Sequence, residues 1–143
     1  MKKYWTGCVV LLSLLMSISA HSQEQKKDVL NLLKDTQFWG LIQSGNTCIE
    51  KYNFLPSGEV LISSHLERIT GHYSLLENSE TFALPAVVIN FKTDNKQPDC
   101  AGNSTNQAGT STTNFLKRVS DQELYFCNDA LGKDCPVSLR PQH

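Results

Sequence analysis

Beyond its N-terminus the sequence has no long hydrophobic run, and it has little net charge. After the first 22 residues, no apolar segment approaches the ~20 residues of a membrane-spanning helix. The 14 acidic residues only just outnumber the 13 basic ones, and neither sign forms a block. A chain without a basic patch has little electrostatic attraction for nucleic acid or for an anionic membrane surface. We therefore expect neither of these as a partner.

Sequence patterns typical of enzymes are also missing. No Gly-x-Ser-x-Gly elbow is present to expose a nucleophilic serine. His65, Glu67 and His72 could bind zinc only across a hairpin, because histidines seven residues apart lie on opposite faces of one strand. Glu50 and Glu67 could serve a glycosidase only as two carboxylates flanking a cleft. We expect a protein that is not an enzyme and that uses neither a metal nor another cofactor.

The N-terminus has the pattern of a secretory signal peptide. Lys2 and Lys3 precede the apolar run CVVLLSLLMSISA, which ends in small residues. Cleavage after Ser22 fits best, and cleavage after Ala20 is the alternative. We expect residues 1–22 to be removed and residues 23–143 to form a single domain. The product would be a periplasmic or secreted protein, which we expect to be a monomer.

The exported chain keeps an even number of cysteines, and this predicts two disulfides. The four are Cys48, Cys100, Cys127 and Cys135. Three pairings are possible. We favour a bridge between Cys127 and Cys135 across a hairpin, which leaves Cys48 to hold Cys100. The longer bridge would close a loop of about fifty residues and stabilise the fold by about 4 kcal/mol in the chain-entropy model.

The hydrophobic pattern predicts one short helix followed by a β-domain. Val29, Leu30, Leu32 and Leu33 form a two-turn apolar stripe, so this helix must pack on something larger, as a lid or an end plug. Short β-rich runs then recur about every ten residues, which is typical of an antiparallel sandwich or barrel. Eight runs are found, at residues 38–44, 47–55, 59–65, 69–77, 82–92, 111–119, 123–128 and 136–140. Eight strands are enough to close a small up-and-down barrel.

Turn residues, a proline and one long connection give three further signals. Pro56 and Gly58 in the turn LPSG suit a tight hairpin. Pro85 lies inside a strong run, so that strand is at an edge, begins after Pro85 or contains a bulge. Residues 93–110 form one long connection, uncharged and rich in hydroxyl and amide groups over much of its length. A loop of this length is usually functional or tied down, and Cys100 offers the tie.

Several stretches resemble the small bacterial lipocalin-like (calycin-type) exported domains. These are YNFLPSGEV, GHYSLL and VVINF, in which Tyr52, Phe54, Gly58, Gly71 and Tyr73 match the family pattern. The resemblance covers roughly half of the mature chain. It implies an antiparallel up-and-down barrel that accepts a small apolar or amphipathic ligand.

The resemblance also implies a structural role for one arginine. In lipocalin-like proteins an arginine of the last strand packs over the ring of the first-strand tryptophan. Arg140 has the matching position relative to Trp39, and Arg118 is the competing candidate. Such a contact would be worth about 0.5 to 2 kcal/mol.

The expected ligand site is the interior or mouth of the barrel. Its candidate residues are Trp39, Glu50, Tyr52, Phe54, Tyr73 and Phe91. Glu50 shares a face with Tyr52 by alternation, so it is either a ligand contact or one half of an ion pair with Arg68 or Lys117. The alternative function is a protein inhibitor or immunity factor, which would block an exported hydrolase or toxin with the loop of residues 99–114.

Overall fold

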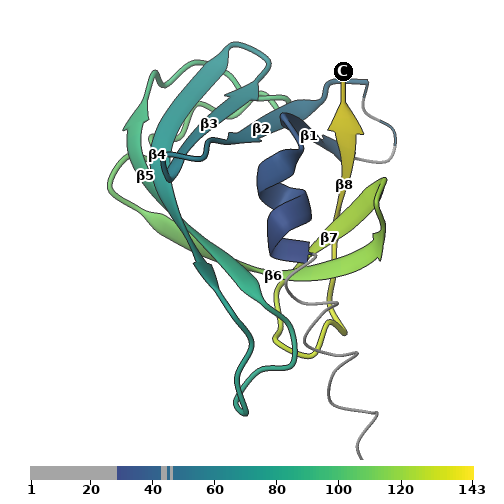
Figure 1. Ribbon diagram of the computed structural model, residues 1–143. Helices are drawn as coiled ribbons and strands as arrows, with labels where there is room; N and C mark the ends of the chain where they lie inside the picture. Colours follow the sequence, from purple (N-terminus) through teal and green to yellow (C-terminus); the bar gives the residue numbers. More distant parts are fainter. Residues whose placement is uncertain (1–28, 43–44, 46) are drawn as a thin grey trace, which may run out of the picture.

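The protein is an eight-stranded antiparallel barrel that closes on itself, with one short helix inside the ring (Figure 1). The computed structural model describes residues 29–42, 45 and 47–143, so the predicted signal peptide lies outside the described residues. The strands follow the order of the chain: β1 (Phe38–Ile42), β2 (Glu50–Phe54), β3 (Glu59–Ser64), β4 (Glu67–Leu76), β5 (Ala86–Asp94), β6 (Ser111–Ser120), β7 (Glu123–Cys127) and β8 (Val137–Gln142). Pairing of β1 with β8 completes the barrel. The predicted fold class is confirmed.

Local sequence explains where these strands begin and turn. β5 begins at Ala86, directly after Pro85, which is one of the three possibilities that the proline allowed. The Pro85 carbonyl accepts a hydrogen bond from the amide of Leu116 at 2.8 Å, so β6 still pairs with this segment. Gly58 has a φ of 88° in the β2–β3 turn, and its amide donates to the Leu55 carbonyl at 3.0 Å. A positive φ at this position favours glycine.

Alternation along the strands separates an apolar interior from a wet outer face. In β3, Val60, Ile62 and Ser64 are buried, whereas Glu59 and Leu61 are exposed. In β4 the inward positions run from Glu67 through Ile69 to Tyr73. The buried apolar core includes side chains of every strand and of the helix. Its largest members, each with less than 2% of the surface exposed, are Trp39, Phe54, Leu33, Ile89, Leu116, Leu124 and Leu139.

The helix, residues 29–35, fills one part of the barrel interior (Figure 1). Val29, Leu30 and Leu33 are buried in the same cluster as the strand side chains. The indole nitrogen of Trp39 donates to the Leu33 carbonyl at 3.1 Å. The last carbonyls of a helix have no partner within the helix, so this bond satisfies a group that would otherwise be buried without one. The helix is therefore an end plug.

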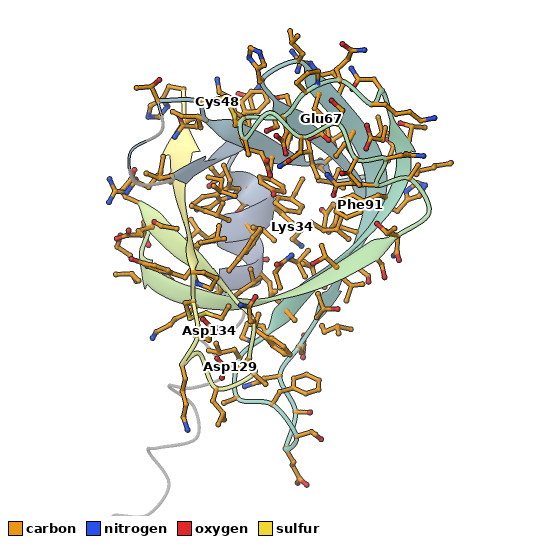
Figure 2. All side chains as sticks on the ribbon, turned by 180° about the vertical axis from the view of Figure 1, so that it is seen from behind. Lys34, Cys48, Glu67, Phe91, Asp129 and Asp134 are labelled. Atoms are coloured by element: carbon orange, nitrogen blue, oxygen red, sulfur yellow. A yellow bond between two sulfur atoms is a disulfide. The ribbon has the colours of Figure 1, made fainter. Side chains whose placement is uncertain are left out.

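The two disulfides are Cys48–Cys100 and Cys127–Cys135, as the favoured pairing predicted. The first joins the end of the β1–β2 connection to the long β5–β6 loop, residues 95–110. The second closes the β7–β8 loop, in which the Asp129 carboxylate accepts hydrogen bonds from the amides of Leu131, Lys133 and Asp134. In Figure 2, Cys48 lies on the side of the barrel opposite Asp129.

The expected packing of Arg140 over the Trp39 ring is wrong. In the β1–β8 ladder, Trp39 is opposite Pro141 and Gly40 is opposite Arg140. Trp39 faces the interior and has no exposed surface, so Arg140 faces outward. The Arg140 side chain is 58% exposed and lies 3.4 Å from the Glu123 carboxylate. The competing candidate, Arg118, forms an ion pair with Asp121 near the β6–β7 turn.

Candidate ligand-binding cavity

The barrel interior is largely filled by the helix and the core side chains, and one hollow part remains. A cavity of about 230 Å³ is lined by side chains of six strands and of the β5–β6 loop. The lining residues are Leu41, Tyr52, Ile89, Phe91, Gln107, Thr112, Asn114, Phe126 and Val137. Five of these nine residues have hydrocarbon side chains, and the side chains of the other four carry a hydroxyl or an amide. Such a mixture suits a ligand with an apolar body and a few polar atoms.

Aromatic rings build one wall of this cavity. The Tyr52 and Phe126 rings meet edge to face, with centroids 5.8 Å apart and planes at 85°. Tyr52 also stacks on Phe54 at 6.1 Å, and Phe54 meets Tyr73 edge to face at 5.1 Å. These are favourable aromatic geometries. The wall of the cavity is therefore continuous with the packed core and is held in place by it.

Tyr52 carries the first polar group of the cavity. Its hydroxyl donates a short hydrogen bond to the carboxylate of Glu50, two residues earlier on the same strand face. Burial raises the pKa of Tyr52 well above its usual value, and the negative charge of Glu50 and the hydrogen bond to it raise the pKa further. Tyr52 is thus a neutral phenol that donates its hydroxyl hydrogen to Glu50. Its oxygen can still accept a hydrogen bond.

Gln107 carries the second polar group and links the cavity to a buried carboxylate. Its amide nitrogen donates to Glu67 Oε1 at 3.4 Å. Glu67 is only 3% exposed. Burial raises the pKa of Glu67, and the charges of Asp94, Asp99 and Glu50 act in the same direction, against the hydrogen bond from Gln107. Within the described part of the chain, neither Glu50 nor Glu67 forms an ion pair.

The β5–β6 loop holds Gln107 in this position through backbone contacts. The Gln107 amide donates to Asp94 Oδ2 at 2.8 Å, and the Gly109 amide donates to the Phe91 carbonyl at 2.9 Å. Earlier in the loop, the Cys100 amide donates to the hydroxyl of buried Ser64 at 3.0 Å. Together with the Cys48–Cys100 bridge, these bonds fix the loop against the barrel.

The residues predicted to bind ligand lie in three different surroundings. Tyr52 and Phe91 line the cavity, and Glu50 lies behind Tyr52 as its hydrogen-bond acceptor. Trp39 and Phe54 lie in the packed core with 0% and 1% of their surface exposed. Tyr73 donates its hydroxyl to the Leu55 carbonyl at 2.8 Å. Figure 2 shows Phe91 and Glu67 on the same side of the barrel.

The other charged candidates are placed apart from the cavity. Arg68 and Lys117 do not pair with Glu50: the Arg68 guanidinium donates to the carbonyls of His65 and Glu67, and Lys117 donates to the Gly132 carbonyl. His72 is exposed on the outward face of β4, whereas Glu67 faces inward. Among the residues described, no group of three His, Cys, Asp or Glu side chains could hold a metal ion.

Sequence reasoning missed seven of the cavity residues. These are Leu41, Ile89, Gln107, Thr112, Asn114, Phe126 and Val137. Alternation could have found some of them, because Ile89 shares a face with Phe91 and Thr112 shares one with Asn114. Gln107 belongs to a loop without any period, so no sequence signal places it at the cavity.

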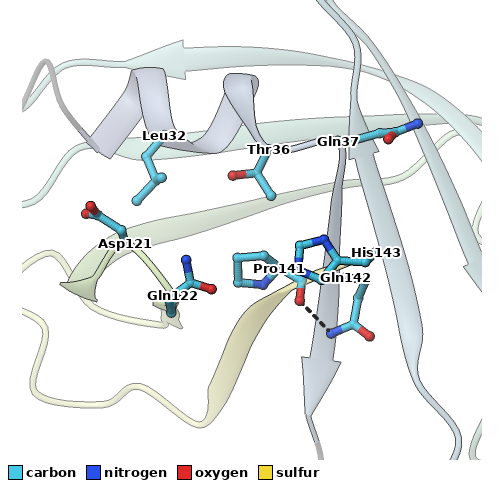
Figure 3. A pocket seen from close by; sticks show the side chains of 8 residues that line it. All are labelled: Leu32, Thr36, Gln37, Asp121, Gln122, Pro141, Gln142 and His143. Carbon is cyan, nitrogen blue, oxygen red and sulfur yellow. Dashed lines mark hydrogen bonds between the residues drawn. The ribbon is translucent and has the colours of Figure 1, made fainter.

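A second hollow, of about 360 Å³, lies at the surface beside the helix (Figure 3). Leu32 and Thr36 face it from the helix and its C-terminal end, Asp121 and Gln122 from the β6–β7 turn, and His143 from the chain end. Several of these side chains are exposed, including Asp121, Gln122 and His143. It is a hollow between exposed surface segments, whereas the barrel cavity lies among inward-facing strand side chains and remains the candidate site.

Comparison of the chain with protein-family models, with curated proteins and with solved structures found no match in any of the three. Among the described residues, no helix has both the length and the apolar character to cross a membrane.

Proposed function

We propose that the protein is an exported, non-catalytic binding protein that holds a small apolar or amphipathic ligand inside its barrel. The observation that carries the proposal is the cavity of about 230 Å³ between Tyr52, Phe91 and Phe126. An apolar cavity of about 150 Å³ is known to take up benzene, whereas pockets for drug-sized ligands begin near about 300 Å³. The ligand would be the size of a single substituted ring or a short chain.

The fold and the disulfides support this proposal. A closed eight-stranded meander is the architecture of the lipocalin-like proteins that the sequence resembles. Two disulfides persist most readily outside the cytoplasm, which agrees with a periplasmic or secreted protein. Here the helix occupies only part of the interior, which leaves room for a ligand in the rest.

A matched pair of phenylalanine substitutions tests the proposal. Val137 lines the cavity, whereas Val119 is 56% exposed on the outside of the barrel. Val137→Phe should fill the cavity and abolish the binding of a small probe such as benzyl alcohol, measured by methyl NMR at Leu41 and Ile89. Val119→Phe adds the same volume outside and should bind normally. Equal binding by both variants, or no binding by the unaltered protein, would refute the proposal.

The inhibitor or immunity factor stays a second candidate because of the β5–β6 loop. Residues 101–106 are exposed, and Asp99 and the Cys48–Cys100 bridge hold their base. A fixed, exposed loop loses little conformational entropy when a partner binds. Native mass spectrometry of protein taken from exporting cells separates the two functions, because a retained small molecule and a bound protein add very different masses.

A further inference from the structure

The polar groups of the barrel cavity have a preferred direction. Tyr52 and Gln107 each use a hydrogen of their own to reach a carboxylate, Glu50 and Glu67 respectively. The Tyr52 oxygen and the Gln107 carbonyl oxygen are left to accept. A ligand head that donates hydrogen bonds therefore finds acceptors at both of these groups, whereas the Tyr52 hydroxyl hydrogen is already engaged by Glu50. Thr112 and Asn114, the other two polar lining residues, can donate or accept, so the sign of charge near Tyr52 and Gln107 decides between heads.

The charge around this end of the cavity is also of one sign. Glu50 and Glu67 stand directly behind the two polar lining groups, and Asp94 and Asp99 are close enough to disfavour charge on Glu67. Lys51 and Arg68, the cations next to Glu50 and Glu67 in sequence, are both exposed on the outer face of the barrel, and Arg68 donates to backbone carbonyls. Burial of Glu67 reduces the screening of its charge by solvent.

We propose that the barrel cavity selects small amines, with an apolar body between Phe91 and Phe126 and a cationic head toward Glu50 and Glu67, and rejects carboxylates of the same shape. This inference rests on the proposed function, because it names the ligand class of the same cavity. The apolar lining alone would accept either kind of molecule, so the preference comes from the carboxylates behind Tyr52 and Gln107.

Three probes with one body and different heads test the inference. 2-Phenylethylamine, 2-phenylethanol and phenylacetate each carry one ring and a short arm, which suits a cavity of about 230 Å³. Calorimetric titration at neutral pH should give the amine an affinity at least about tenfold higher than that of phenylacetate, with the alcohol between them. Adding salt should narrow the difference in affinity only in part, because Glu67 is buried from solvent whereas Glu50 is half-buried.

Neutral carboxylate mimics identify the source of the preference. The double variant Glu50→Gln/Glu67→Gln should lose most of the preference for the amine and keep its affinity for 2-phenylethanol. Glu59→Gln is the matched control, because Glu59 is an exposed carboxylate on the outer face of β3, and it should behave as the unaltered protein.

The outcomes separate this inference from the proposed function. If phenylacetate binds as tightly as the amine, or if the double variant keeps the preference, the inference is overturned while ligand binding in the cavity stands. If the amine fails to bind but benzyl alcohol binds, the inference is again overturned alone. If none of these molecules binds the unaltered protein, the proposed function fails as well.

Discussion

Glu67 and Tyr52 show how single residues set the chemistry of the barrel interior. Glu67 is an acidic side chain with 3% of its surface exposed, and its carboxylate accepts a hydrogen bond from Gln107. Tyr52 keeps its proton because burial and the neighbouring Glu50 raise its pKa. A buried carboxylate without an ion pair is costly for a fold. Its presence at the cavity is the kind of local cost that accompanies a binding site.

Replacing Glu67 with glutamine should stabilise the protein at neutral pH. Because the pKa of Glu67 is raised in the folded state, its favourable contribution is complete only below about pH 4.3, the value of an unperturbed glutamate. That contribution is lost as the pH rises through the higher, folded pKa. Glu67→Gln imitates the protonated form, so its free energy of unfolding should exceed that of the unaltered protein at pH 7 and match it near pH 4.

Urea unfolding at the two pH values measures this effect. Glu59→Gln, at an exposed position, is the control and should change stability little at either pH. A Glu67→Gln protein that is less stable than the unaltered one at pH 7 would contradict the account, because it would mean that the Glu67 charge stabilises the fold.

Among the elements, the β5–β6 loop depends most on covalent and hydrogen-bonded ties. Its residues lie between Asp94 and Ser111, and it reaches back to β3 and β4 through Cys100 and Pro98. The Pro98 carbonyl accepts hydrogen bonds from the amides of Leu66 and Glu67 at 3.1 and 3.2 Å. The loop therefore positions both Glu67 and Gln107, although it has no regular structure of its own.

The two disulfides should contribute unequally to stability. Cys48–Cys100 spans 52 residues and Cys127–Cys135 spans 8. In the chain-entropy model the longer bridge is worth about 4 kcal/mol and the shorter one about 2.5 kcal/mol. Chemical unfolding of Cys48→Ala/Cys100→Ala and Cys127→Ala/Cys135→Ala should give losses in that order.

The affinity for a cavity probe is a second property in which the two disulfide variants should differ. Without the Cys48–Cys100 bridge, the loop that carries Gln107 is less constrained, so affinity for a cavity probe should fall. Without Cys127–Cys135, affinity should change less, because no residue of the β7–β8 loop lines the cavity. If loss of the Cys127–Cys135 bridge lowered both stability and affinity more than loss of the Cys48–Cys100 bridge, the Cys48–Cys100 bridge would not be what holds the β5–β6 loop in place.

For the whole molecule, the sequence predicted the barrel much better than the cavity. Eight β-rich runs predicted an antiparallel sandwich or barrel, and the closed barrel was the form that the family resemblance implied. The four cysteines allowed three pairings, of which the favoured one is present. Alternation identifies inward faces, and on that basis Phe54 and Tyr52 are equivalent. They differ in depth along the barrel axis, which depends on strand register and on where the helix fills the interior. Neither quantity is encoded in the local pattern of one strand.

The interior of the barrel is divided between a part filled by side chains and a part that is hollow. Leu33 of the helix, Trp39 and Leu139 have no exposed surface and form the filled part. Tyr52, Phe91 and Phe126 border the hollow part. Without the helix, the apolar residues that it covers would face water, so the helix explains why only one part of the barrel is open.

Diffraction from crystals of residues 23–143 under xenon pressure tests this division, because xenon binds against the apolar walls of internal cavities. The account predicts an anomalous peak among Ile89, Phe91 and Phe126 and none beside Leu33 or Trp39. A barrel without a xenon peak, with Phe91 and Phe126 turned into the space between them, would contradict it.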